Sequence, residues 1–276
     1  MKHDPRITPA RDGIAARSLE GVLEAEVYLD PKAMSCLAAA SAIRSAPDAN
    51  AEQMDQLLFG ERFEVLEEEG AWLFGQAARD GYVGFVEATA LQPAGPLPTH
   101  RVAAIRTYAF AEASIKSRAS GPYSINSLVA VEATQGKLAK VAGAGWMTAA
   151  HLAPIGTVED DWAAVAERFV GAPYLWGGRE SLGLDCSGLV QQALFACGLA
   201  CPRDTDQQEA LGTAIDAADF VRGDLVFWKG HVAIGLGEGR IVHANGHHMA
   251  VASEPLAEAV ARISAGGSDP TSYRRI

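Results

Sequence analysis

The chain has 276 residues, of which 49% are hydrophobic, and its formal net charge is −11. This length allows two or three domains with real apolar cores. The negative charge argues against a nucleic-acid partner, which needs a basic face, and against an anionic membrane surface or wall polymer. Residues 1–21 contain no apolar core of signal-peptide length, so we expect a cytoplasmic protein, although a signal peptide removed earlier would leave the same picture.

The first part of the chain predicts a polar arm followed by a small all-β domain. We expect residues 1–30 to form the arm, with one or two helical turns, and the segment LEAEVYL at 23–29 to be either a strand or a continuation of it. In residues 31–95, short apolar alternations such as Phe63 with Val65 are broken by Gly, Asp and Pro. Short strands at this density are typical of a small barrel.

An internal repeat predicts a second barrel over residues 96–155. Residues 63–70 match residues 129–136 in strand pattern and in the final turn glycine, and residues 84–91 match residues 145–152 in the same way. Each repeat ends before a proline-containing linker. Two tandem modules are the natural interpretation of such a repeat.

Residues 156–276 mix helical and strand patterns, which predicts an α+β domain. We expect one helix to begin at Thr157, capped with Asp160, and another to begin at Thr205, capped with Gln208. The strands LVFW, HVAIGL and RIVHA follow, the last two joined by a tight hairpin at 237–239. A short helix from Pro255 and a last strand at Ser272 and Tyr273 complete the domain.

The stretch PYLWGGRESLGLDCSGLVQQALFACG, residues 173–198, predicts a reactive cysteine. Apolar residues recur at helical spacing after Cys186, and Gly198 suits the end of that helix. Cys186 therefore lies in the first turn, where the unpaired N–H groups and the helix dipole favour a thiolate. The alternative is that Cys186 is a small buried apolar residue.

Two histidines lie on the hairpin, and a cysteine hydrolase needs such a pair. His231 begins the first strand and is the candidate base, and His243 on the second strand is the candidate that orients it. With the turn at 237–239, we expect the two residues to be nearly opposite, on one face and in hydrogen-bonding range. His247 and His248 follow in a loop that we expect to be solvated.

The cysteine count gives little support to a disulfide framework or a metal site. The four cysteines are Cys36, Cys186, Cys197 and Cys201. A zinc site at Cys197 and Cys201 would need two more ligands at suitable spacing, and His243, His247 and His248 are candidates for them. We therefore expect neither a metal nor another cofactor.

The motifs YLWGG, DCSGLVQ, PRDTDQQ, GDLVFW, HVAIGLG and IVHA occur in an order that resembles the NlpC/P60 cell-wall peptidases, a papain-like group of Cys/His hydrolases. The resemblance covers residues 156–276, and the segment before it resembles two bacterial SH3 (SH3b) modules. This architecture is similar to the γ-D-glutamyl-L-diamino-acid endopeptidases that recycle murein peptides. It implies a papain-like catalytic domain whose substrate is a small murein peptide.

The resemblance also implies roles for residues around Cys186. The N–H of Cys186 is one natural donor for an oxyanion, and the resemblance adds the hydroxyl of Tyr174. Asp185, with Tyr174, Ser187 and Thr205, would hold the free amino end of L-Ala-γ-D-Glu. Family members often have Ser where this chain has Thr205. For Asp185 the alternative is a helix N-cap.

The first SH3b module is expected to close the substrate pocket beyond the L-Ala end with a tyrosine and an acidic residue, for which Tyr82 and Glu61 are the candidates. The expected function is thus hydrolysis of the γ-D-glutamyl-L-diamino acid bond in peptides with a free N-terminal L-Ala. The diamino acid, diaminopimelate or lysine, stays open. The alternatives are an amidase or acyltransferase on the same core, or a non-catalytic protein that binds wall peptide.

Overall fold

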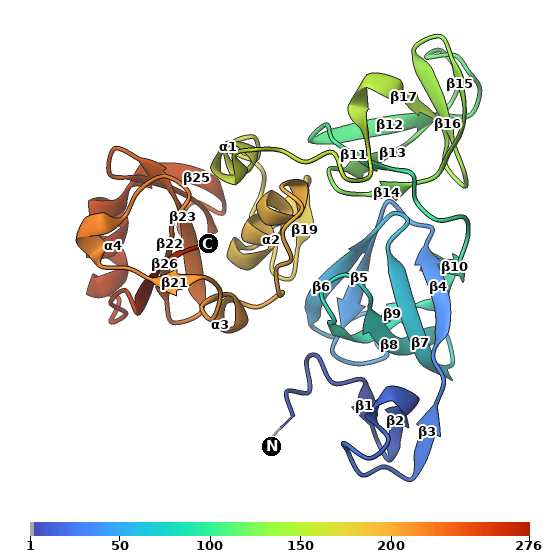
Figure 1. Ribbon diagram of the computed structural model, residues 1–276, viewed down its shortest axis with the longest axis horizontal. Coiled ribbons are helices and arrows are strands. Elements are labelled where there is room, and N and C mark those ends of the chain that lie inside the picture. Colours follow the sequence, from blue (N-terminus) through green and yellow to red (C-terminus); the bar gives the residue numbers. More distant parts are fainter. Residues whose placement is uncertain (1–2) are drawn as a thin grey trace. The chain divides into compact units, whose positions relative to one another are not determined.

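A computed structural model describes residues 3–276 of the chain (Figure 1). Contacts within the chain divide it into two compact units, Met1–Ile155 and Gly156–Ile276. The first unit consists of strands and short 3-10 turns, and the second combines helices with a six-stranded sheet. The chain therefore has the mixed α+β character that the sequence predicts. No helix in residues 3–276 is long and apolar enough to cross a membrane.

The N-terminal segment contains a small sheet and not only the expected arm. Its strands are β1 (Ala10–Arg11), β2 (Ile14–Ala16) and β3 (Val27–Leu29), and one 3-10 turn lies at Arg17–Leu19. β3 pairs in parallel with β2, which pairs antiparallel with β1. Ala16 packs with Phe74 and Phe85 of the following strands. Strands this short depend on pairing and packing with distant residues, which a sequence pattern does not display.

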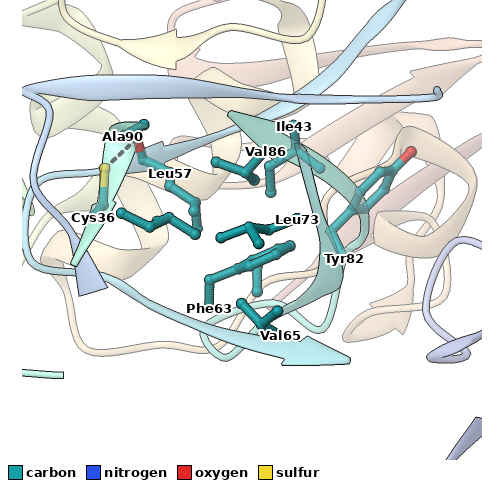
Figure 2. Packing of buried hydrophobic residues seen from close by; sticks show 11 residues of the cluster. Cys36, Ile43, Leu57, Phe63, Val65, Leu73, Tyr82, Val86 and Ala90 are labelled. Atoms are coloured by element: carbon teal, nitrogen blue, oxygen red, sulfur yellow. Dashed lines mark hydrogen bonds between the residues drawn. The ribbon is translucent and has the colours of Figure 1, made fainter. Parts of the chain in front are cut away.

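Seven strands form the first β-module in one sheet of order β10-β4-β7-β8-β9-β5-β6. They are β4 (Lys32–Cys36), β5 (Ala40–Arg44), β6 (Gln53–Leu58), β7 (Arg62–Glu69), β8 (Trp72–Ala77), β9 (Val83–Glu87) and β10 (Leu91–Pro93). Gly70 joins β7 to β8 with a φ of +63°, in the left-handed region that glycine adopts without strain. Figure 2 shows the core of this module, in which Ile43, Phe63 and Leu73 meet from three strands.

The second β-module has its own strands and core. The strands are β11 (His100–Val102), β12 (Arg106–Phe110), β13 (Ala119–Ser124), β14 (Leu128–Val129), β15 (Val131–Gln135), β16 (Leu138–Val141), β17 (Gly145–Thr148) and β18 (Leu152–Pro154). They form a three-stranded and a five-stranded sheet. Val102, Val141 and Met147 are buried between them.

The internal repeat corresponds to matching elements in the two modules. Gly136 follows β15 with a φ of +59°, as Gly70 follows β7. Both modules also end with a strand, a 3-10 turn and a further strand: the turns are Ala88–Ala90 after β9 and Ala149–His151 after β17. The two aligned segments therefore occupy equivalent places in their modules.

The second unit is built around an antiparallel sheet of order β21-β26-β22-β23-β24-β25. Its strands are β21 (Thr213–Ala214), β22 (Leu225–Trp228), β23 (His231–Gly237), β24 (Arg240–Asn245), β25 (Ala250–Pro255) and β26 (Ser272–Arg275). A separate two-stranded piece is formed by β19 (Arg179–Glu180) and β20 (Gly183–Leu184). Helices α2 (Cys186–Ala196) and α4 (Leu256–Ala265) lie on opposite sides of the sheet (Figure 1). The sheet thus brings residues from both helices close to β23 and β24.

Two predicted helix starts are displaced in the structure. The first helix, α1 (Trp162–Glu167), begins after Asp161, whose side chain accepts a hydrogen bond from the N–H of Ala164, and not at Thr157. Helix α3 (Thr205–Gln208) has its capping box at Asp204 and Gln207, one residue before the predicted pair. In both cases an aspartate is the cap, in keeping with the strong preference of that position for Asp.

Candidate active site

Cys186 is the first residue of α2, as the sequence predicts. Asp185 is the N-cap, and its side chain accepts a hydrogen bond from the N–H of Gly188. A side chain at position 188 would meet the carbonyl oxygen of Gly178 at 2.2 Å, so glycine is required for this close approach. The thiol of Cys186 is buried and lies 3.8 Å from the hydroxyl of Thr205. The helix start and the loop before it therefore hold the cysteine in one place.

The environment of Cys186 raises its pKa to about 11, the opposite of what the helix start alone predicts. Burial is the largest cause, and the negative charge of Asp185 adds to it. Hydrogen bonds with Thr205 and with the backbone of Val232, together with the charge of Arg203, act in the other direction without reversing the shift. At neutral pH the resting sulfur is therefore a thiol, and a base must take its proton.

The two predicted histidines are joined by a hydrogen bond of 2.8 Å between Nε2 of His231 and Nδ1 of His243. The expected contact is confirmed, but the expected register is wrong. The ladder pairs Ile234 with Val242, and a continuation of that register places His243 opposite Ala233. The two histidines are thus diagonal neighbours on one face. An irregularity between Gly235 and Gly237 shifts the register, and simple counting from the turn does not include such a shift.

A carboxylate and an arginine that the sequence analysis missed extend the series of contacts beyond His243. Nε2 of His243 lies 2.7 Å from Oε1 of Glu254, at the end of β25. Arg262 on α4 donates to both oxygens of Glu254, at 2.7 and 2.6 Å. This arginine is the largest cause that lowers the pKa of Glu254, to about 2. The residue is therefore ionised and can only accept hydrogen bonds.

This series of contacts assigns the protons on both rings. Because ionised Glu254 only accepts, His243 carries its proton on Nε2 and its Nδ1 is an acceptor. His231 must then donate from Nε2 to His243, which leaves Nδ1 of His231 without a proton. Burial, and to a smaller extent the neighbouring His243, lower the pKa of His231 to about 3, so the ring is neutral. His231 is thus a neutral base, next in the chain to Val232, whose N–H contacts the Cys186 thiol.

Asp185 is bound on both of its oxygens. Arg203, which is 1% exposed, donates to both of them, at 3.0 and 2.6 Å. The backbone N–H groups of Gly177 and Gly188 and the hydroxyl of Ser187 donate to it as well. The N-cap alternative is therefore confirmed. A substrate ammonium would have to share a carboxylate that is already neutralised by an arginine. Arg203 is the third residue, after Glu254 and Arg262, to which the sequence analysis gave no role.

Tyr174 lies close enough to Cys186 and Asp185 to respond to their charges. Burial, and to a smaller extent the charges of Cys186 and Asp185, raise the pKa of its hydroxyl to about 12. The hydroxyl thus stays protonated and available as a donor. The backbone of Tyr174 is tied to Met249 and to Leu184, which places it beside the start of α2.

Tyr82 and Glu61, the candidates from the first β-module, are both buried. The Tyr82 ring packs at the margin of the module core, and Figure 2 shows its hydroxyl directed away from that cluster. Glu61 accepts from Arg79 at 2.8 Å and from the N–H of Leu58. Their proposed part in closing a substrate pocket stays a prediction.

Within residues 3–276, one group of side chains has the spacing of metal ligands. Ligand atoms of His243, His248 and Glu254 lie within 4.8 Å of one another. His243 is already hydrogen-bonded to His231, and Glu254 is bound on both oxygens by Arg262. A cation there would have to displace the guanidinium or lie beside it. The geometry therefore fits an ion-paired series better than a metal centre.

Two family profiles match the chain. The NlpC/P60 family profile matches residues 171–262, which include Cys186, His231 and His243. The profile of the bacterial dipeptidyl-peptidase Sh3 domain matches residues 43–91, within the first β-module. The SH3b assignment of residues 96–155 stays a prediction.

Similar proteins are found among bacterial peptidases. The chain is 32% identical over 211 residues to a γ-D-glutamyl-L-lysine dipeptidyl-peptidase of Bacillus subtilis, over 68% of this chain and 71% of the relative. It is 29% identical over 228 residues to dipeptidyl-peptidase 6 of Lysinibacillus sphaericus, over 72% and 82% of the two chains. A crystal structure of an NlpC/P60 family protein from Bacillus cereus has a TM-score of 0.76 at 20% identity, covering 88% of this chain and 99% of that one. The structural likeness concerns the fold.

Proposed function

Because this chain belongs to the NlpC/P60 family, we propose that it is a cysteine peptidase that hydrolyses the γ-D-glutamyl-L-diamino acid bond of small murein peptides with a free N-terminal L-Ala. One observation carries the proposal: a neutral base, His231, is oriented by His243 and Glu254 next to the backbone group that contacts the Cys186 thiol. This is the arrangement that acyl transfer through a cysteine requires.

The reaction begins from a neutral thiol and a neutral imidazole. Nδ1 of His231 takes the thiol proton as the sulfur of Cys186 attacks the γ-carbonyl carbon of D-glutamate. The proton moves during attack, because the pKa values of about 11 for Cys186 and about 3 for His231 disfavour a resting ion pair. The imidazolium then gives its proton to the leaving amine as the carbon–nitrogen bond breaks. Water attacks the thioester, His231 accepts a proton from it, and the dipeptide and the thiol are released.

The oxyanion of each tetrahedral intermediate needs donors that are already in place. The backbone N–H of Cys186 at the start of α2 is one, and the protonated hydroxyl of Tyr174 is the other. Because burial keeps Tyr174 protonated, it donates throughout the neutral range. The positive end of α2 favours the same negative charge.

The preference for a free amino end is supported by the names of the relatives and by the residues beside Cys186. Both relatives described above are named dipeptidyl-peptidases, one for the γ-D-glutamyl-L-lysine bond. Asp185, Ser187, Thr205 and Tyr174 surround the start of α2 and are the polar groups proposed to receive the L-Ala ammonium. Peptides of this kind arise during wall recycling in the cytoplasm, where we also expect the protein to act.

The nucleophile is tested by Cys186→Ala. This variant should fold normally and show no turnover of L-Ala-γ-D-Glu-diaminopimelate, because only the attacking sulfur is lost. Cys197→Ala is the matched control and should keep most activity. Mass spectrometry of the wild-type enzyme during turnover should detect Cys186 carrying the dipeptide acyl group. Turnover by Cys186→Ala would refute the mechanism, and a wild-type protein that binds the peptide without cleaving it would be a non-catalytic binder.

The substrate is tested by comparing free and N-acetylated tripeptide. Acetylation removes the ammonium charge and adds bulk, so most turnover should be lost. The products of the free tripeptide should be L-Ala-γ-D-Glu and the diamino acid, identified by chromatography. Equal rates on the two peptides would refute the free amino end as a requirement. Cleavage or transfer on other amides, without cleavage of the γ-D-glutamyl bond, would identify an amidase or acyltransferase.

A further inference from the structure

A recess lies beside the histidines, and Asp185 is not among its lining residues. It has a volume of about 210 Å³ and is bounded by the β22–β24 strands and the end of α4. Its lining includes His231 and His243 but none of the residues proposed above to hold the dipeptide end of the substrate. The recess, which we name the histidine-side pocket, is lined by Trp228, Lys229, His231, His243, Asn245, Gly246, His247, Arg262, Ile263 and Ser268.

The histidine-side pocket carries one positive charge that no carboxylate compensates, that of Lys229, although the whole chain carries −11. Lys229 and Arg262 both line it, and no carboxylate does. Lys229 is exposed and forms no ion pair with any residue from 3 to 276. Glu254, which contacts the lining residues His243 and Arg262, has both oxygens bound by them. A lysine without a partner thus faces a recess that contains no acid of its own.

The local backbone fixes the position of Lys229 relative to the base. Trp228 at the end of β22 pairs with His231 at the start of β23. Lys229 and Gly230 are therefore the two residues of the connecting turn, and Gly230 has a φ of +73°. A turn this short holds Lys229 within two residues of the base on a rigid hairpin.

We propose that the histidine-side pocket binds a carboxylate of the leaving diamino acid through Lys229. The inference rests on the proposed function. In that reaction His231 gives a proton to the leaving amine, so the leaving group must lie against His231, which lines this pocket. Trp228 and Ile263 provide apolar walls for its methylene stem. The positive charge of Lys229 attracts a carboxylate of the leaving group and repels a side chain that carries only a positive charge, such as that of lysine.

Two carboxylates of the leaving group fit this chemistry, and they can be separated by synthesis. One is the α-carboxylate at the end of a tripeptide, and the other is the side-chain carboxylate of diaminopimelate. The substrates are L-Ala-γ-D-Glu-X, with X as diaminopimelate, diaminopimelate amidated on the side chain, diaminopimelate with a C-terminal amide, and lysine. Loss of kcat/KM on C-terminal amidation identifies the first source. Loss on side-chain amidation, and a matching deficit for lysine, identifies the second.

One of the two amidations removes the bound carboxylate. The expected loss of kcat/KM on that amidation is about twofold to fivefold, the range for one exposed ion pair. Lys229→Glu should abolish this discrimination or reverse it, and Lys229→Met should abolish it. Arg240→Glu is the matched control: it makes the same change in net charge in the same unit, outside the pocket lining, and should keep the wild-type preference.

The possible outcomes separate this inference from the proposed function. If the γ-D-glutamyl bond is cleaved but neither amidation changes kcat/KM, the inference is wrong and the proposed function stands. The inference is equally wrong if Lys229→Glu and Arg240→Glu show the same preference. If no substrate of the series is cleaved, the proposed function fails and the inference fails with it.

Discussion

Two carboxylates flank the proposed catalytic pair, Asp185 beside Cys186 and Glu254 behind His243, and each is bound on both oxygens by an arginine. The arginines differ in burial: the side chain of Arg203 is 1% exposed and that of Arg262 is 29% exposed. The carboxylates also differ in their other partners. Asp185 accepts from backbone N–H groups at the start of α2, whereas Glu254 accepts from a histidine ring.

These differences indicate that the Asp185–Arg203 and Glu254–Arg262 ion pairs have different roles in the same site. In the Asp185–Arg203 pair, the carboxylate accepts hydrogen bonds from backbone N–H groups and so fixes the start of α2 and the position of Cys186. The same carboxylate raises the pKa of the Cys186 thiol. The Glu254–Arg262 pair holds a side chain, so it determines which ring nitrogen of His243, and then of His231, carries a proton. We therefore expect the first pair to matter most for stability and the second to matter most for turnover.

The largest expected effect comes from Arg203→Met. It leaves the buried charge of Asp185 without its partner, which should lower the free energy of unfolding by about 3–5 kcal/mol. Arg262→Met is the matched variant and should lower it by less, because this arginine is 29% exposed and its loss lets water reach the carboxylate of Glu254. Urea denaturation followed by tryptophan fluorescence measures both. Equal losses for the two variants would contradict the assignment of a structural role to one pair only.

A smaller effect, on turnover, is expected from Glu254→Ala. Without an acceptor, His243 no longer keeps its proton on Nε2, so kcat should fall about tenfold to a hundredfold, as for partners that orient other functional histidines. Glu254→Gln should lose less, because the amide oxygen can still accept from His243. A KM that stays near the wild-type value would agree with a positioning role.

The same variants have a direct spectroscopic readout. Nitrogen chemical shifts of the histidine rings report which nitrogen is protonated. They should show Nε2 protonated on His243 and His231 in the wild type and in Glu254→Gln, and a mixture of tautomers in Glu254→Ala. An unchanged tautomer in Glu254→Ala, together with a loss of kcat, would argue that Glu254 acts through folding alone.

The smallest expected effect is a pH dependence of stability. The pKa of Glu254 is lowered from 4.5 to about 2 in the folded protein, mainly by the hydrogen bond from Arg262. A lowered carboxyl pKa stabilises the fold above pH 4.5, and this stabilisation is lost as the pH falls toward 2. The difference in unfolding free energy between wild type and Glu254→Gln should therefore shrink over this interval. Denaturation at a series of pH values measures this difference in unfolding free energy. If the difference stays constant between pH 4.5 and pH 2, the lowered pKa of Glu254 does not contribute to stability.

Local sequence patterns predicted the elements of the second unit that depend on neighbours in the chain. Cys186 begins its helix and the two histidines contact each other, because helical periodicity and a short hairpin are local properties. The helix starts were displaced to Asp161 and Asp204, because several capping residues occur together and the pattern does not choose among them. The repeat in the first unit was visible because glycines mark equivalent turns.

By itself the sequence determined the α+β class, the cysteine at a helix start and the histidine pair on a hairpin. Only the tertiary structure decided that Arg203 and Arg262 neutralise the two carboxylates and that Glu254 stands behind His243. These contacts join residues from different elements, and no local pattern encodes which side chains meet across a packed interface. The tertiary structure also decided the direction of the Cys186 pKa shift, because burial raises it more than the nearby hydrogen bonds and the charge of Arg203 lower it, and burial is a property of the folded chain alone.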